Sequence, residues 1–233
     1  MSQHRAASGP WPLLLVLASV LAAFVATFFT LVALDPATFE RTGRVSADAM
    51  VAFGIKDDTR IAAGHLAGLV RAGLVHHSWV HLALNSVSLI LFALLLWRLV
   101  LPIDRTIGRA GAILAIVVVS STGGFALSFL VGNGLSAGAS GAVFGLLGAL
   151  PLALVVRTDL GPPRLRWRLA AALMALGALG VALLSGGGGV DHAAHLGGLS
   201  TGIPLGYAQA RRAGRIGLMV AALGLVALGF LPA

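Results

Sequence analysis

Seven long runs of apolar residues dominate this sequence and limit what it can fold into. They approach or exceed the roughly 20 residues with which an α-helix crosses the ~30 Å hydrocarbon core of a bilayer. The alternation of apolar and polar residues that marks a membrane-spanning strand is absent. The sequence therefore predicts an all-α polytopic membrane protein. The expected spans are 11–34, 79–97, 110–132, 137–156, 169–184, 193–210 and 216–231.

Composition supports a membrane protein over a soluble one. Of the 233 residues, 58% are hydrophobic and only 10% are charged, whereas charged residues make up about a quarter of a soluble domain. The chain has no cysteine, which excludes disulfides and thiolate metal sites. The net charge of +8 is explained below by membrane topology, so we expect no nucleic-acid partner.

The distribution of basic residues predicts how the chain crosses the membrane. With a cytoplasmic N-terminus, 11 of the 16 lysines and arginines fall on the inner side, and the other five lie in one long outer loop, 35–78. The short outer connections, near Asn133 and at 185–191, contain none. This asymmetry follows the positive-inside rule. We therefore expect a multi-pass protein of the cell membrane (inner or plasma membrane) with its N-terminus in the cytoplasm.

The outer loop 35–78 has a composition unlike that of a disordered linker. It carries five acidic and five basic residues and contains apolar patches at Met50–Ile55 and Ile61–Val75. Such segments favour short helices at the membrane interface. Loops of this length are usually functional.

Four polar side chains are expected at one depth, just below the outer surface. Ser140 lies about one turn into the span 137–156, His81 and Asn85 lie near the outer start of 79–97, and His195 lies near the outer start of 193–210. Polar residues inside a membrane are costly and usually functional. The topology therefore predicts that these groups meet in one shallow site.

Ser140 and His195 suit nucleophilic catalysis if their helices touch. A serine is a weak nucleophile until a neighbouring base removes its proton, and a neutral imidazole is such a base. Small residues on both spans, Gly141 and Gly198 among them, allow helix backbones to approach closely. Acyl transfer also needs donors for an oxyanion. His81 and Asn85 are four residues apart, on one helix face, and the Ser140 N–H in the first helical turn is a further donor.

Three motifs resemble the signatures of the rhomboid intramembrane serine proteases. They are "GASG" at 138–141, "HLALN" at 81–85 and "HAAHLGGLSTG" at 192–202, and they occur in the family's order on the corresponding spans. The resemblance covers about residues 11–210. The last span is similar to the extra helix of the six-plus-one subclass.

The resemblance implies a rhomboid-like bundle of six core transmembrane helices plus one C-terminal helix. A short cytoplasmic N-terminus, 1–10, would precede the six-helix core, 11–210, which includes the outer loop 35–78. The additional C-terminal transmembrane helix would occupy 211–233.

The resemblance also assigns roles to individual residues. Ser140 corresponds to the nucleophile and His195 to the general base of a Ser–His dyad. The oxyanion hole would be formed by His81, Asn85 and the backbone of Ala139. The residues that would support the site are His76, Gly138, Gly141, Phe144 and Gly198.

The activity implied by the family is cleavage of single-pass transmembrane proteins near the outer membrane boundary. The protein would work within the lipid bilayer and without a cofactor or metal ion. The sequence leaves the oligomeric state open.

The chain departs from the family pattern in two places. Many relatives carry a Trp-Arg pair in the first loop, where this chain has Ala67 and Gly68. An Asp-Asn pair often precedes the histidine of the sixth span, where this chain has Asp191 and His192. We expect Asp191 to cap its helix, whereas His192 either bonds near the site or faces the interface. For His76 and His77, an interface position is the preferred interpretation from the sequence alone.

Other classes of enzyme fit the sequence less well. His77 and His81 are four residues apart, but an intramembrane metalloprotease uses H-E-x-x-H, and residue 78 is serine. The chain contains a single glutamate, Glu40. The G-x-S-x-G elbow of α/β-hydrolases also fails, because residue 142 is alanine.

Two non-enzymatic functions fit a multi-pass membrane protein of this kind. A transporter would place charges at the membrane midplane or show inverted repeats, and neither is found. A non-catalytic rhomboid-like factor that binds or chaperones membrane proteins remains the alternative. Such a protein would be expected to have lost its serine or histidine, and this chain retains both Ser140 and His195.

Overall fold

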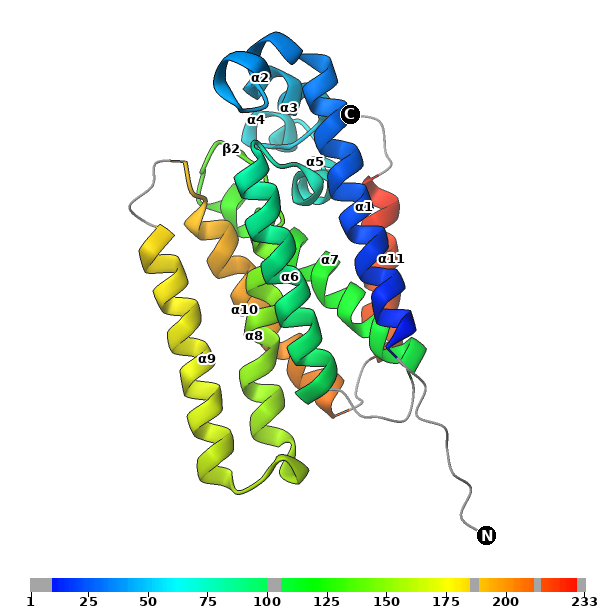
Figure 1. Ribbon diagram of the computed structural model, residues 1–233, viewed down its shortest axis with the longest axis vertical. Coiled ribbons are helices and arrows are strands. Elements are labelled where there is room, and N and C mark those ends of the chain that lie inside the picture. The colour runs from blue at the N-terminus through cyan, green and yellow to red at the C-terminus, as the bar shows by residue number, and fades with distance from the viewer. Residues whose placement is uncertain (1–9, 100–105, 185–188, 212–214, 230–233) are drawn as a thin grey trace.

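The computed structural model describes residues 10–99, 106–184, 189–211 and 215–229. Within these ranges long helices form a bundle, and short helices gather at one end of it (Figure 1). The long helices are α1 (Trp11–Leu34), α6 (Trp79–Leu99), α7 (Thr106–Leu130), α8 (Ser140–Val156), α9 (Pro163–Leu184), α10 (His192–Ala210) and α11 (Arg215–Gly229). Among the described residues, α1, α6 and the 108–130 part of α7 are long and apolar enough to cross a membrane, and α8 is a shorter apolar helix.

Two helix boundaries differ from the sequence prediction. Helix α9 begins at Pro163, six residues before the expected start of its span at 169. It therefore has 22 residues, more than the expected span 169–184 contains. Proline is favoured at the first position of a helix, and arginine is a good helix former, so the "PRLRWR" segment continues the helix.

Helix α8 begins at Ser140, three residues later than expected. Ser140 therefore stands at the helix start, and the prediction that it lies one turn inside the span is wrong. The preceding backbone is extended at Leu135–Ser136 and then passes through Gly138 with φ +130°, which is incompatible with a helix.

The segment between α1 and α6 contains short helices, as its composition predicted. They are α2 (Pro36–Thr42), α3 (Ala47–Phe53), α4 (Asp58–Ala62), α5 (Gly68–Arg71) and the 3₁₀ turn η1 (Ala72–Leu74). We call 35–78 the outer segment. Asp35, Ser46 and Asp57 cap the first three of these helices by accepting backbone N–H groups, which satisfies donors that the helix cannot.

A two-stranded antiparallel sheet joins the outer segment to the connection before α8. Strand β1 (Lys56–Asp57) pairs with β2 (Leu135–Ser136), with Lys56 opposite Ser136 and Asp57 opposite Leu135. This pairing connects parts of the chain that are far apart in sequence. It fixes the backbone a few residues before Ser140.

Helix α8 is the central helix of the bundle and packs most closely against α10. A Cβ atom placed on Gly198 would lie 2.1 Å from the carbonyl oxygen of Gly141, and one on Gly202 would lie 2.0 Å from that of Gly145. The two helices therefore touch backbone to backbone at positions four residues apart on each. This is the close approach that small residues permit between membrane helices.

Candidate active site

The N-terminus of α8 presents open backbone donors around Ser140. Ala139 is the N-cap residue and makes no side-chain capping hydrogen bond. The N–H of Val143 donates to the Ala139 carbonyl at 3.0 Å, so the N–H groups of the first turn before it have no partner within the helix. Such N–H groups can bind a negatively charged oxygen.

The neighbouring helices α6 and α10 are capped by side chains. Ser78 Oγ accepts the His81 N–H at 3.3 Å at the start of α6. Asp191 Oδ1 accepts the Ala194 N–H at 2.9 Å at the start of α10, which confirms the prediction that Asp191 is an N-cap. Of these three helix starts, only that of α8 lacks a side-chain cap.

Two contacts show that Ser140 and His195 lie within one helical turn of each other on adjacent helices. Phe144, one turn after Ser140, stacks on the His195 ring with centroids 4.5 Å apart and planes at 18°. Gly198, one turn after His195, lies against the Gly141 backbone. The pairing of Gly141 with Gly198 places Gly197 opposite Ser140, so His195 lies two residues, less than one helical turn, from the level of the serine on the adjacent helix. The His195 side chain is 4% exposed, and its Nδ1 has no hydrogen-bond partner among the described residues.

His81 and Asn85 reach the turn that precedes Ser140. A Cβ atom on Gly138 would lie 2.8 Å from His81 Nε2 and 3.8 Å from Asn85 Nδ2. Asn85 is buried, and within the described part of the chain its Nδ2 has no partner. A buried amide donor without a partner is costly. This donor is therefore available to a group that enters the site.

Gly138 itself has a backbone conformation that favours glycine. Its φ is +130°, and its N–H donates to the Ala72 carbonyl at 2.9 Å. A side chain there would combine backbone strain with a contact of 2.6 Å to His81 Cε1. Gly138 thus lets His81 approach the turn closely.

His76 is buried and does not occupy the interface position considered from the sequence. Its ring centroid lies 4.9 Å from that of Phe24 and 5.1 Å from that of His81, and its exposed fraction is 0%. Nδ1 lies 3.2 Å from the Leu74 carbonyl, to which it donates when protonated. Burial lowers the pKa of His76 to about 4, so its ring is neutral near pH 7.

The pKa of His76 predicts that it weakens the fold in acid. The unfolded chain binds a proton near pH 6.5, whereas the folded chain does so only near pH 4, so His76 destabilises the fold as pH falls through this window. In His76→Gln, the fall in melting temperature between pH 7 and pH 4.5 should be smaller by about 5 °C. Thermal unfolding in detergent at the two pH values measures this difference in melting temperature. His65→Gln is the control, because His65 is exposed. An unchanged pH dependence in His76→Gln would contradict this assignment.

His192 lies beside the site, with its ring edge to face with that of His195 at an interplanar angle of 82°. The two ring centroids are 6.1 Å apart. The preceding Asp191 accepts a hydrogen bond from Ser128 Oγ at 2.5 Å, which ties the start of α10 to α7. Burial acts to raise the pKa of Asp191, but hydrogen bonds from Ser128, Ser136 and Ala194 outweigh it and lower the pKa. The cap thus remains an anion.

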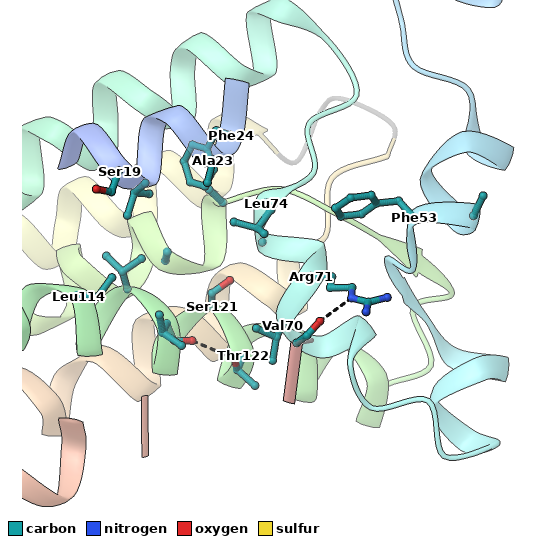
Figure 2. Close-up of a pocket in the computed structure, with 18 residues that line it drawn as sticks. Ser19, Ala23, Phe24, Phe53, Val70, Arg71, Leu74, Leu114, Ser121 and Thr122 are labelled. Atoms are coloured by element: carbon teal, nitrogen blue, oxygen red, sulfur yellow. Dashed lines mark hydrogen bonds between the residues drawn. The ribbon is translucent and has the colours of Figure 1, made fainter. Parts of the chain in front are cut away.

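A cavity of about 640 Å³ adjoins the first turn of α8 (Figure 2). Ala139 and Ala142 form its wall on that side, and most of the remaining lining residues are apolar. Ser121 of α7 also lines it, and its hydroxyl has no hydrogen-bond partner within the described ranges. The sequence did not predict this cavity, because its walls come from segments far apart in the chain. It leaves open space next to the residues that flank Ser140.

Comparison with known proteins agrees with these motifs. The family model of the rhomboid domain matches residues 63–212. The chain is 30% identical over 193 residues to the rhomboid protease GluP of Bacillus subtilis (strain 168), which covers 81% of this chain and 36% of that protein. It is 31% identical over 142 residues to RHOMBOID-like protein 4 of Arabidopsis thaliana, which covers 60% of this chain and 33% of that protein.

The chain thus spans about a third of the length of each of these curated relatives. No solved structure matches it. The matched domain extends from the outer segment through α10 and includes all three motifs. The chain therefore belongs to the rhomboid family.

Proposed function

We propose that this protein is an intramembrane serine endopeptidase that cleaves single-pass transmembrane proteins near the extracytoplasmic boundary. The observation that carries the proposal is the uncapped start of α8. Around it Phe144 stacks on His195, Gly198 lies against Gly141, and His81 and Asn85 reach the turn before Ser140, which supports a meeting of Ser140 with His195. GluP, to which the chain is similar, is itself described as a rhomboid protease.

The proposed reaction uses Ser140 and His195 as a dyad. His195 takes the proton of the Ser140 hydroxyl while Oγ attacks the scissile carbonyl carbon, and the carbonyl oxygen becomes an oxyanion. Asn85, His81 and the backbone N–H groups at Ala139 and Ser140 donate hydrogen bonds to that oxyanion. The imidazolium then protonates the leaving amine. His195 then deprotonates water, whose oxygen attacks the acyl carbon; the bond from that carbon to Ser140 Oγ breaks, and the imidazolium returns the proton to Oγ.

We further propose a cytoplasmic N-terminus, seven spans and a location in the cell membrane. The support is the concentration of basic residues in alternate short connections. With this orientation Ser140, His81 and His195 face the outer side of the membrane, where water can reach the acyl-enzyme. Neither a cofactor nor a metal ion enters the proposed reaction.

A serine-directed fluorophosphonate probe tests the nucleophile directly. The wild-type protein in detergent or liposomes should be labelled and should cleave a transmembrane peptide, whereas Ser140→Ala should do neither. Retained helicity and melting temperature of Ser140→Ala would show that the fold is intact. Equal labelling and cleavage by both proteins would reject the protease. Absence of both activities from a folded wild type would favour the non-catalytic binding or chaperone alternative.

The oxyanion proposal predicts a selective loss of rate when Asn85 is truncated. Asn85→Ala should lower kcat by on the order of 10²-fold, the cost of removing one oxyanion donor, with a small change in KM. Leu84→Ala is the matched control, because Leu84 is the neighbouring α6 residue and is 62% exposed. Equal kcat values for the two variants would exclude Asn85 as an oxyanion donor.

A further inference from the structure

Lys56 is completely buried, although the sequence predicted it to be one of the charges of the outer loop. It is the only lysine in the chain, and its exposed fraction is 0%. Lysine is almost never fully buried unless it is paired. Its Nζ lies 2.5 Å from Asp58 Oδ1 and donates to the Gly134 carbonyl at 2.9 Å.

Asp58 holds the other polar group of the same glycine. The Gly134 N–H donates to Asp58 Oδ2 at 2.7 Å. The two members of this ion pair therefore hydrogen-bond to both the N–H and the C=O of Gly134. The β1–β2 pairing begins at the next residue, Leu135. We call Lys56, Asp58 and their bonds to Gly134 the Gly134 clamp.

The clamp lies at the start of the turn that delivers Ser140. By this turn we mean residues 134–139, which include the short strand β2. A hydrogen bond from the Gly138 N–H to the Ala72 carbonyl holds its far end. Both ends are thus anchored to the outer segment. The turn contains Ala139 and leads directly into the open first turn of α8.

This ion pair is buried on the lysine side alone, because the side chain of Lys56 is 0% exposed and that of Asp58 is 24% exposed. Taking the lysine charge out of water offsets much of the attraction to Asp58, so the pair is a poor source of stability. Folding energy alone therefore does not explain why Lys56 is buried. The hydrogen bonds to Gly134 offer a second reason, because they fix the position of a backbone segment as well as joining two side chains.

We propose that the Gly134 clamp positions the 134–139 turn so that Ser140 and the first-turn N–H groups of α8 keep their reactive geometry. Lys56 and Asp58 are positioning residues in this account, and the proposal rests on the proposed protease function. Displacement of a reacting group by about 1 Å can cost on the order of 10²-fold in rate. The competing explanation is that the clamp only stabilises the outer segment.

The test compares Lys56→Met/Asp58→Asn with a matched ion-pair variant, Arg157→Met/Asp159→Asn. Arg157 and Asp159 also lie 2.5 Å apart but follow the opposite end of α8. The clamp variant should lose about 10- to 100-fold in kcat and in the rate of fluorophosphonate labelling, with KM within about 3-fold. Hydrogen exchange of peptides spanning 134–142 should accelerate in the clamp variant. The Arg157/Asp159 variant should match wild type in all four measurements.

A milder variant keeps the test interpretable if the double variant fails to fold. Asp58→Asn keeps an oxygen that can accept the Gly134 N–H, so it should fold and should show a smaller loss of kcat than the double variant. Wild-type labelling and exchange in both clamp variants would overturn the proposal and leave the protease intact. A melting temperature that falls without any change in kcat or labelling would also overturn it. A wild-type protein that is never labelled would overturn both proposals together, and that failure is visible before any variant is made.

Discussion

Replacement of His195 by phenylalanine should reduce cleavage by on the order of 10⁴-fold or more, because loss of one member of a Ser–His pair removes nearly all of its catalysis. Phenylalanine keeps a flat ring that can stack on Phe144, where the imidazole now stacks at 4.5 Å. It cannot accept the Ser140 proton. The loss should therefore appear in kcat and in fluorophosphonate labelling, while the melting temperature changes little.

His192→Phe is the matched control for this prediction. His192 is the other histidine of α10, and its ring centroid lies 6.1 Å from that of His195. Phenylalanine keeps a ring that can lie edge to face with residue 195, as His192 does now, so this replacement should preserve most of the activity. The opposite result, with His192→Phe inactive and His195→Phe active, would assign the role of general base to His192. If both variants were as active as wild type, cleavage would not depend on a Ser–His dyad.

Features encoded over a few residues could be predicted from the sequence. The apolar run from Trp11 to Leu34 sets the bounds of α1, because nothing within it opposes a helix and Pro12 favours the start. Asp191 was predicted to be an N-cap because aspartate is common there, and the structure confirms it. The rhomboid family could be assigned because its three motifs are short and ordered.

Features that depend on distant partners could not be predicted. The start of α8 was placed three residues early because "SAGAS" is apolar enough to continue a span. Pairing of β2 with β1 and the positive φ of Gly138 prevent this. The burial of Lys56 was not predicted either, because the sequence only places it among the five basic residues of 35–78. Its burial depends on Gly134, 78 residues later, and no local pattern reveals such a contact.

The contact between α8 and α10 predicts the other large effect, in Gly198→Ala. The added Cβ would lie 2.1 Å from the Gly141 oxygen, 2.8 Å from its carbonyl carbon and 3.0 Å from its Cα. All three are backbone atoms, so no side-chain rotation can relieve the clash and the helices must separate. Overpacking of this kind costs about 1–3 kcal/mol, or roughly 2–12 °C in melting temperature. Because Gly141 follows Ser140 directly, cleavage should also fall by at least about 10²-fold.

Two other glycine variants separate the helix contact from a general effect of the substitution. Gly224→Ala in α11 meets no atom within 4 Å, so it should leave cleavage unchanged and, by improving helix propensity, should not lower the melting temperature. Gly202→Ala meets the Gly145 oxygen at 2.0 Å and should destabilise the fold as much as Gly198→Ala does. Gly145 lies more than one turn beyond Ser140, however, so its effect on cleavage should be smaller. A Gly198→Ala protein that melts and cleaves like Gly224→Ala would show that α8 and α10 do not need backbone contact, and the alignment of Ser140 with His195 would lose its physical basis.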